Sequence, residues 1–228
     1  MTRRALIVMA KQPVAGQTKT RLSPPLSLGE AADLYTCLLL DTLEVVRDVA
    51  GQLPLRPFVA FYPAHGQSDI QSLAPDFQLL AQQGHNLSER LSGALLSVQD
   101  QGYDQVTAIN SDSPGLPAAF LIQAYQELDD PGIDVVLGPC DDGGYYLIGW
   151  KRPYPNLVRD VTMSTPTVLA DTVALAQDAG LQVAMLPPWY DVDNAAALSR
   201  LQANGHAGRH VEDFIGRSQM NPRKGDQV

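Results

Sequence analysis

Short apolar runs alternate along the chain with longer stretches that carry apolar residues at helical spacing. Ala5–Ala10, for example, has the continuous apolar character of a strand that is covered on both faces. Ser27 and Glu30 form a capping-box pattern, and apolar positions at helical spacing follow as far as Val49. Strands that alternate with helices favour a mostly parallel sheet with helices on both faces. We therefore expect an α/β fold.

The remaining elements follow from the same patterns. Two predicted strands, Asp134–Pro139 and Tyr145–Trp150, flank a turn-rich segment and are expected to pair as an antiparallel hairpin. Further strands are expected at 58–62, 77–81, 106–109 and 182–186, and further helices at about 87–101, 117–128, 166–179 and after residue 194. We expect one domain over residues 1–217, followed by a polar tail, 218–228, that frays.

Composition excludes several classes of partner. The chain has 228 residues and a net charge of -9, which gives no electrostatic support for binding nucleic acid or an anionic membrane. No apolar run approaches the roughly 18 residues of a membrane-spanning helix. The two cysteines, Cys37 and Cys140, do not suggest a disulfide framework. We expect a cytoplasmic monomer or homodimer.

A basic loop follows the first predicted strand. Lys11, Lys19 and Arg21 flank Gly16 in a chain that is otherwise acidic. The charged side chains and the loop N–H groups suit the phosphates of a nucleotide. The loop matches neither a Walker sequence nor the Gly-x-Gly-x-x-Gly of a dinucleotide fold. The alternative is a solvated basic loop without a ligand.

One carboxylate stands where ligands bind in open α/β sheets. The predicted strand Val106–Ile109 runs into Ser111-Asp112-Ser113-Pro114, which places Asp112 at the carboxyl end of a strand. Mg²⁺ prefers one or two carboxylates together with substrate phosphate oxygens, so Asp112 is a candidate metal ligand. Alternatively, its side chain only caps the turn.

A second acidic segment is Asp141-Asp142-Gly143-Gly144-Tyr145. Successive side chains of an extended segment point to opposite faces, so we expect only one of the two aspartates to face a site. The glycines would allow a ligand to approach the backbone closely. An Asp-Gly hairpin turn is the alternative.

A third acidic segment, Asp191-Val192-Asp193, places both carboxylates on one face if it is extended, which suits metal binding. Alternatively, Asp193 caps the next helix. His206 and His210 have the spacing of helical metal ligands. Because Gly205 and Gly208 weaken a helix there, we interpret both histidines as surface residues.

The order of these segments resembles one bacterial family. The segments are Lys-x-Pro-x-x-Gly-x-x-Lys-Thr-Arg-Leu from Lys11, Leu87–Arg90, Ser111–Pro114, Gly138–Gly149, Ser164-Thr165 and Asp191–Asp193. The family is that of nucleotide-diphospho-sugar transferase-like proteins, often labelled arsenosugar-biosynthesis-type glycosyltransferases, in the GT-A superfamily. Molybdenum-cofactor and phospholactate guanylyltransferases are more distant relatives. The likeness covers about residues 4–201 and implies a three-layer α/β/α sandwich with a mixed, mostly parallel Rossmann-like sheet.

The resemblance also implies roles for individual residues. The implied nucleotide-binding residues are Lys11, Gly16, Lys19, Arg21, Gly84, Glu89 and Arg90. The metal, Mg²⁺ or Mn²⁺, would be held by Asp112 and Asp193, with Asp191 added from its spacing. The acceptor or sugar side would comprise Gly143, Gly144, Tyr145, Ser164 and Thr165. Asn110, Met163 and Asn194 depart from the residues usual in the family. Met163 and Asn110 affect the expected base and acceptor selectivity more than the metal site.

These observations favour a metal-dependent glycosyltransferase with a nucleotide-diphospho-sugar donor and a small-molecule acceptor. The ion and the basic loop would neutralise the departing diphosphate, and Asp142, or else Asp141, would act as the base. The alternative is a nucleotidyltransferase, in which an anionic phosphate acceptor needs little base and Lys19 and Arg21 stabilise pyrophosphate. A non-catalytic nucleotide-binding module ranks last.

Overall fold

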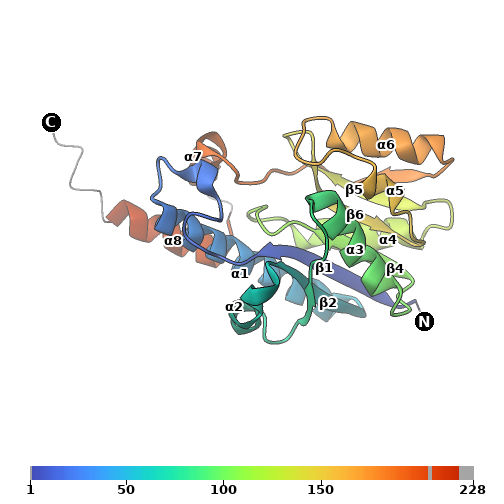
Figure 1. Cartoon of the computed structure of the whole chain (residues 1–228), viewed down its shortest axis with the longest axis horizontal. Coiled ribbons are helices and arrows are strands. Elements are labelled where there is room, and N and C mark those ends of the chain that lie inside the picture. The colour runs from blue at the N-terminus through green and yellow to red at the C-terminus, as the bar shows by residue number, and fades with distance from the viewer. Residues whose placement is uncertain (1, 205–206, 221–228) are drawn as a thin grey trace.

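The computed structural model describes residues 2–204 and 207–220 and has a seven-stranded sheet in the order β3-β2-β1-β4-β6-β5-β7 (Figure 1). The strands are β1 (Arg4–Lys11), β2 (Leu55–Tyr62), β3 (Gln78–Ala81), β4 (Gln105–Ile109), β5 (Val135–Pro139), β6 (Tyr145–Trp150) and β7 (Val183–Met185). Strand β6 runs antiparallel to β4 and β5, whereas the other neighbouring strands are parallel. The predicted mixed, mostly parallel sheet is confirmed, as is the hairpin.

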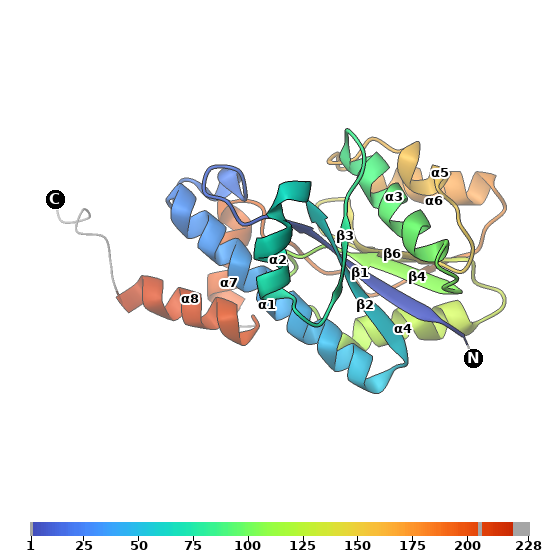
Figure 2. The same ribbon diagram turned by 60° about the horizontal axis from the view of Figure 1, so that its bottom comes forward.

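Helices cover both faces of the sheet. On one face lie α1 (Leu28–Gln52), α2 (Gln67–Leu73) and α4 (Ala118–Asp129), and on the other α3 (Leu87–Gln99), α5 (Asn156–Arg159) and α6 (Val168–Asp178). Figure 2 shows the sheet between these two layers. Alternate residues of β1 enter opposite cores, as strand geometry requires: Leu6 and Val8 pack on the α1 side, Ala5 and Ile7 on the α3 side. The predicted α/β/α sandwich is confirmed.

A third hydrophobic cluster lies beyond the end of the sheet (Figure 1). It joins the first half of α1 to α7 (Ala195–Asn204), α8 (Arg209–Met220) and the short 3₁₀ helix η1 (Thr20–Leu22). Leu22 and Val192 are fully buried in it. These two residues fix the basic loop and the Asp191–Asp193 segment to the same small core, so the cluster positions two of the predicted site segments.

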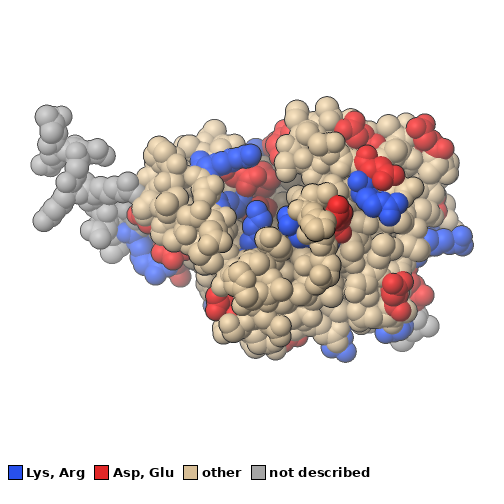
Figure 3. Space-filling model, in the orientation of Figure 1, with Lys and Arg blue, Asp and Glu red and all other residues tan. Residues whose placement is uncertain are grey.

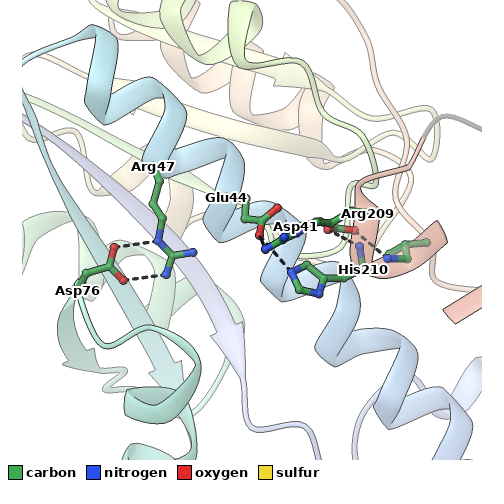
Figure 4. A network of polar contacts seen from close by, with 7 residues as sticks. Asp41, Glu44, Arg47, Asp76, Arg209 and His210 are labelled. Atoms are coloured by element: carbon green, nitrogen blue, oxygen red, sulfur yellow. Dashed lines mark hydrogen bonds and ion pairs between the residues drawn. The ribbon is translucent and has the colours of Figure 1, made fainter. Parts of the chain in front are cut away.

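Helix α8 was not predicted. It begins at Arg209, directly after Gly208, and residues 207 and 208 are not helical, in keeping with the expectation that Gly208 weakens a helix there. The backbone N–H groups of His210 and Val211 each donate to a carboxylate oxygen of Asp41 on α1, at 3.0 Å (Figure 4). A Cβ atom on Gly208 would lie 2.2 Å from Asp41 Cγ. Glycine therefore permits Asp41 to cap the first turn of α8, whose N–H groups have no partner within the helix.

Two further polar contacts of α1 appear in Figure 4. Glu44 contacts both Arg209 and His210 of α8, and Arg47 forms a bidentate pair with Asp76, in the loop that follows α2. His210 is thus a contact residue between helices. His206 lies outside the described residues. So do residues 221–228 of the expected tail, whereas α8 continues through residue 220.

Helix boundaries follow local signals in most places. The capping box of Ser27 and Glu30 and the cap by Asn86 are present as predicted. Helix α6 begins later than expected, at Val168, because Ser164 adopts a left-handed backbone (φ 64°) and the chain turns there first. Helices α2 and α5 were not predicted. No helix in the described part of the chain is long and apolar enough to cross a membrane.

Candidate functional site

A pocket of about 620 Å³ opens at the carboxyl ends of β1 and β4. This edge is a topological switch point, because the strand order reverses there: β2 and β3 lie on one side of β1, and the strands that follow β4 lie on the other side of β4. Ligands of open α/β sheets bind at such points. The volume lies in the range of roughly 300–1,000 Å³ that is usual for small-molecule sites. Figure 3 shows basic and acidic side chains side by side near the middle of this face of the molecule.

Lys19 connects the basic loop to the acidic segments. Its ammonium nitrogen lies 2.7 Å from Asp112 Oδ2 and 2.5 Å from Asp193 Oδ1, and only 6% of its side chain is exposed. Burial opposes the charge on Lys19, but the two carboxylates outweigh burial and raise its pKa, so Lys19 stays protonated at neutral pH. Lys11 and Arg21 also line the pocket. The structure thus gathers three cations of the predicted phosphate loop at one wall.

Four carboxylates line the same pocket, namely those of Asp112, Asp142, Asp191 and Asp193. Asp141 points away and pairs with Arg200 at 2.5 Å, so only one member of the Asp141-Asp142 pair faces the site. Asn194, not Asp193, caps α7, since its side-chain oxygen accepts the N–H of Ala197 at 3.0 Å. Asp193 therefore remains available to the site.

The acidic wall has the character of a cation site. Oδ1 of Asp112 is buried without a hydrogen-bond partner in the described structure. Burial and the neighbouring carboxylates of Asp112, Asp193 and Asp142 raise the pKa of Asp191 to about 7. A bound cation would satisfy the free oxygen of Asp112 and offset the crowding of like charges. The residues at this wall therefore fit a divalent ion held by Asp112 and Asp193, with Asp191 beside them.

The other half of the pocket is largely apolar. Its walls are formed by Met9, Leu91, Ala108, Ile148 and Val168. The expected acceptor-side residues Gly144, Tyr145, Ser164 and Thr165 line the pocket between its polar and apolar parts. Gly143 does not line it. A Cβ atom there would lie 2.0 Å from the carbonyl oxygen of Pro166, so this glycine allows the loop before α6 to pack on the hairpin.

Four of the expected nucleotide-binding residues do not line the pocket: Gly16, Gly84, Glu89 and Arg90. Glu89 accepts hydrogen bonds from the N–H of His85 and the amide of Asn86, and so shapes the loop that enters α3. Gly84 lies against Glu89 at a backbone φ of 129°. The guanidinium of Arg90 stacks over Tyr62, 4.3 Å from the ring centroid.

Tyr35 and Cys140 reach the pocket although the sequence did not single them out. The hydroxyl of Tyr35 accepts the N–H of Lys11 and is hydrogen-bonded to Ser111, both at 2.8 Å, which ties α1 to the ends of β1 and β4. In the sequence, Tyr35 is one apolar position of a helical stripe, so no local signal marked it. Cys140 lies in a predicted loop, and no residue pattern around it indicated that its side chain reaches a pocket.

The sheet order and the switch-point pocket define the class of protein: a GT-A-like α/β fold of the kind found in nucleotide-sugar transferases and nucleotidyltransferases. Residues 45–165, a little over half of the chain, match the family described as "Uncharacterized protein conserved in bacteria (DUF2064)", and the chain belongs to this family. No curated protein gives a significant match.

Solved structures support the fold. A provisionally named nucleotide-diphospho-sugar transferase from Desulfovibrio desulfuricans G20 is 28% identical, with a TM-score of 0.86 over 96% of both chains. A CMP:2-keto-3-deoxy-manno-octonic acid synthetase in complex with CTP is 13% identical, with a TM-score of 0.57 over 88% of this chain and 97% of that one. A cytidylyltransferase from Leptospira borgpetersenii is 10% identical, with a TM-score of 0.55 over 100% and 99%. The last two show likeness of fold alone.

Proposed function

We propose that the protein is a metal-dependent transferase that moves a sugar from a nucleotide-diphospho-sugar to a small-molecule acceptor. The observation that carries the proposal is one pocket in which Lys11, Lys19 and Arg21 face the carboxylates of Asp112 and Asp193 at a topological switch point. The likeness to the Desulfovibrio protein, over nearly the whole of both chains, supports the same class of donor.

The basic wall would bind the diphosphate of the donor. Lys19 keeps its charge in the free protein through its two carboxylate partners, so no protonation step has to precede binding. Lys11 and Arg21 add charge-assisted hydrogen bonds to phosphate oxygens. Asp112 and Asp193 would hold Mg²⁺ or Mn²⁺, which when bound would stabilise the negative charge that develops on the departing diphosphate.

Asp142 is the candidate general base. Its Oδ1 accepts the N–H of Gly144 at 2.9 Å, which orients the carboxylate at the pocket wall, whereas Asp141 is engaged by Arg200. In an inverting transfer, Asp142 takes the proton of the acceptor hydroxyl while that oxygen attacks the anomeric carbon and the nucleoside diphosphate departs. Gly144 and Tyr145 would contact the acceptor or the sugar.

A nucleotidyltransferase is the second candidate, and the central place of Lys19 among the carboxylates favours it. In that reaction an anionic phosphate acceptor attacks the α-phosphorus of a nucleoside triphosphate, and Lys19 and Arg21 stabilise the departing pyrophosphate. No carboxylate base is then needed. A non-catalytic nucleotide-binding module is the least favoured, because it would not require the acidic wall.

A thermal-shift panel tests these proposals. The full-length protein is heated with nucleoside triphosphates and with UDP-, GDP-, CDP- and dTDP-sugars, each with Mg²⁺ and with EDTA. We expect one nucleotide-diphospho-sugar to raise the melting temperature in a Mg²⁺-dependent way, and the Lys19→Ala variant to lose the shift while Lys151→Ala keeps it. A shift with triphosphates alone would replace the first proposal by the second. The absence of any metal-dependent shift would contradict both.

We also propose a cytoplasmic location, where a reducing environment would keep the thiols of Cys37 and Cys140 reduced.

A further inference from the structure

We propose that the pocket contains a second cation position, formed by Cys140, Asp142 and Asp191, which binds a thiophilic divalent transition-metal ion such as Zn²⁺. Each of the three residues offers one ligand atom, and these atoms, the cysteine sulfur and two carboxylate oxygens, all lie within 4.8 Å of one another. Three protein ligands beside an open pocket are the arrangement of catalytic zinc sites. A thiolate ligand favours Zn²⁺ or Co²⁺ over Mg²⁺.

The backbone holds the three ligands together without an ion. Cys140 forms an isolated parallel bridge with Trp189, and the N–H of Asp141 donates to the carbonyl of Trp189 at 3.1 Å. Two residues further on, Asp191 therefore lies beside the hairpin turn that carries Asp142. The N–H of Gly144 fixes the Asp142 carboxylate at 2.9 Å. An ion at this position would need little rearrangement of the chain.

The thiol of Cys140 is a separate indication of a ligand. Its side chain lines the pocket and is 6% exposed, and no hydrogen bond reaches its sulfur from the described residues. Cys140 packs in the hydrophobic core on the α1 face of the sheet, and its sulfur lies within 4.8 Å of a carboxylate oxygen of Asp142 and of Asp191. A divalent ion would displace the thiol proton to solvent and neutralise these charges.

The distribution of cations in the pocket points to the same position. Lys19 pairs with both Asp112 and Asp193, with Lys11 and Arg21 as further cations near Asp193, and Arg200 pairs with Asp141. Within the described residues, Asp142 and Asp191 have no cationic partner at ion-pair distance. The two pocket carboxylates without an ion-pair partner are thus those grouped with Cys140. This inference does not depend on which nucleotide the protein uses. While an ion occupies this position, Asp142 would be a ligand, so its proposed role as a base belongs to the protein without that ion.

Cobalt provides the test, because Co²⁺ replaces Zn²⁺ in such sites and a cobalt–thiolate bond gives a charge-transfer band in the near ultraviolet. The full-length protein, freed of metal with EDTA and kept reduced with a phosphine, is titrated with Co²⁺. We expect a saturable band that Zn²⁺ removes and excess Mg²⁺ does not. Cys140→Ser should lose the band, whereas Cys37→Ser, which changes the other cysteine on α1, should keep it.

Asp142→Asn serves as a second variant, because Asp142 is exposed and its replacement leaves the core intact. It should weaken Co²⁺ binding by at least the roughly tenfold that loss of even an outer-shell partner costs. A wild-type protein without the band, or a band that persists in Cys140→Ser, would overturn the proposal. The Mg²⁺-dependent nucleotide shift, measured on the same preparations, reports separately on the proposed function.

Discussion

At the scale of single residues, the ammonium of Lys19 is the connection between the predicted phosphate loop and the predicted metal ligands. It stands between Asp112 and Asp193, which come from segments 93 and 174 residues away in the sequence. A buried charge of this kind is stable only while its partners are present, and the same holds for the partners. The free protein therefore uses Lys19 as an internal counterion at the wall where a divalent ion would bind.

Replacing Lys19 by methionine should expose this role. The variant keeps an unbranched side chain, one atom shorter than that of lysine, but leaves the carboxylates uncompensated, so we expect it to be less stable in EDTA by about 3 kcal/mol. Mg²⁺ should stabilise it more than it stabilises the wild-type protein. Thermal unfolding in EDTA and in Mg²⁺ measures both effects, with Lys151→Met as the control.

The pH dependence of this difference has a definite sign. Burial opposes the ionisation of Asp193, but Lys19 outweighs burial and lowers the pKa of this carboxyl group. The stabilisation by the pair is therefore present above the ordinary aspartate pKa and is lost as pH falls through the lowered value. The stability gap between the wild-type protein and Lys19→Met should therefore shrink below about pH 4. A gap that is independent of pH would show that Lys19 acts only through packing.

Asp142→Asn separates the two candidate chemistries. If Asp142 is the base of a glycosyl transfer, the variant should lose about 10²- to 10⁴-fold in kcat while nucleotide binding persists. Asp141→Asn is the matched control, because Asp141 points to Arg200 and should affect turnover much less. Turnover that survives in Asp142→Asn but disappears in Lys19→Ala would favour nucleotidyl transfer.

At the scale of elements, the docking of α8 on α1 depends on Gly208, the residue that directly precedes the helix. Gly208→Ala would place a Cβ atom 2.2 Å from Asp41 Cγ and disturb the cap of α8. Loss of a cap costs about 1 kcal/mol, and the displacement of Asp41 adds to this.

Gly216→Ala provides the control for that prediction. Gly216 lies in the same helix with nothing within 4 Å of an added Cβ, so the change should be neutral or stabilise α8 by up to about 1 kcal/mol. Hydrogen exchange of the α8 amides, together with thermal unfolding, compares the two variants. Equal behaviour of both would contradict the proposed cap.

At the scale of the whole molecule, the pocket lies where the third cluster meets the sheet. Asp112 and Asp142 are carried by the sheet, whereas Leu22 anchors the loop of Lys19 and Val192 anchors the segment of Asp193 in the third cluster. Binding should therefore depend on how firmly the third cluster is packed. Changes in the cores on the two faces of the sheet should lower the stability of the protein but should not weaken nucleotide binding.

Two leucine-to-alanine changes test this division. Leu22→Ala and Leu43→Ala each remove a fully buried side chain, the first from the third cluster and the second from the core between α1 and the sheet. Each should cost about 2–5 kcal/mol. Only Leu22→Ala should also weaken nucleotide binding severalfold at a temperature where both variants are folded, as measured by calorimetry. Equal affinities would contradict the link between the third cluster and the site.

The sequence by itself determined most of the elements of this protein. The strands, the capping box at Ser27, the N-cap at Asn86 and the hairpin around Asp142 depend on neighbouring residues, and each appears where the pattern predicts it. The placement of charged loops at the carboxyl ends of strands also follows from the order of elements in an α/β sheet. Short helices such as α5 were missed because tertiary packing, and not periodicity, stabilises a single turn.

Only the tertiary structure decided which side chains meet. Lys19 contacts Asp112 and Asp193, and Asp191 lies beside Cys140 and Asp142. In each case the contact joins loops that are distant in sequence. Local propensity does not determine the direction of a loop side chain, because that direction depends on long-range packing such as the burial of Leu22 and Val192. The kinds of chemical group at this pocket could therefore be predicted from the sequence, whereas the packing of the third cluster against the sheet determines which of them pair.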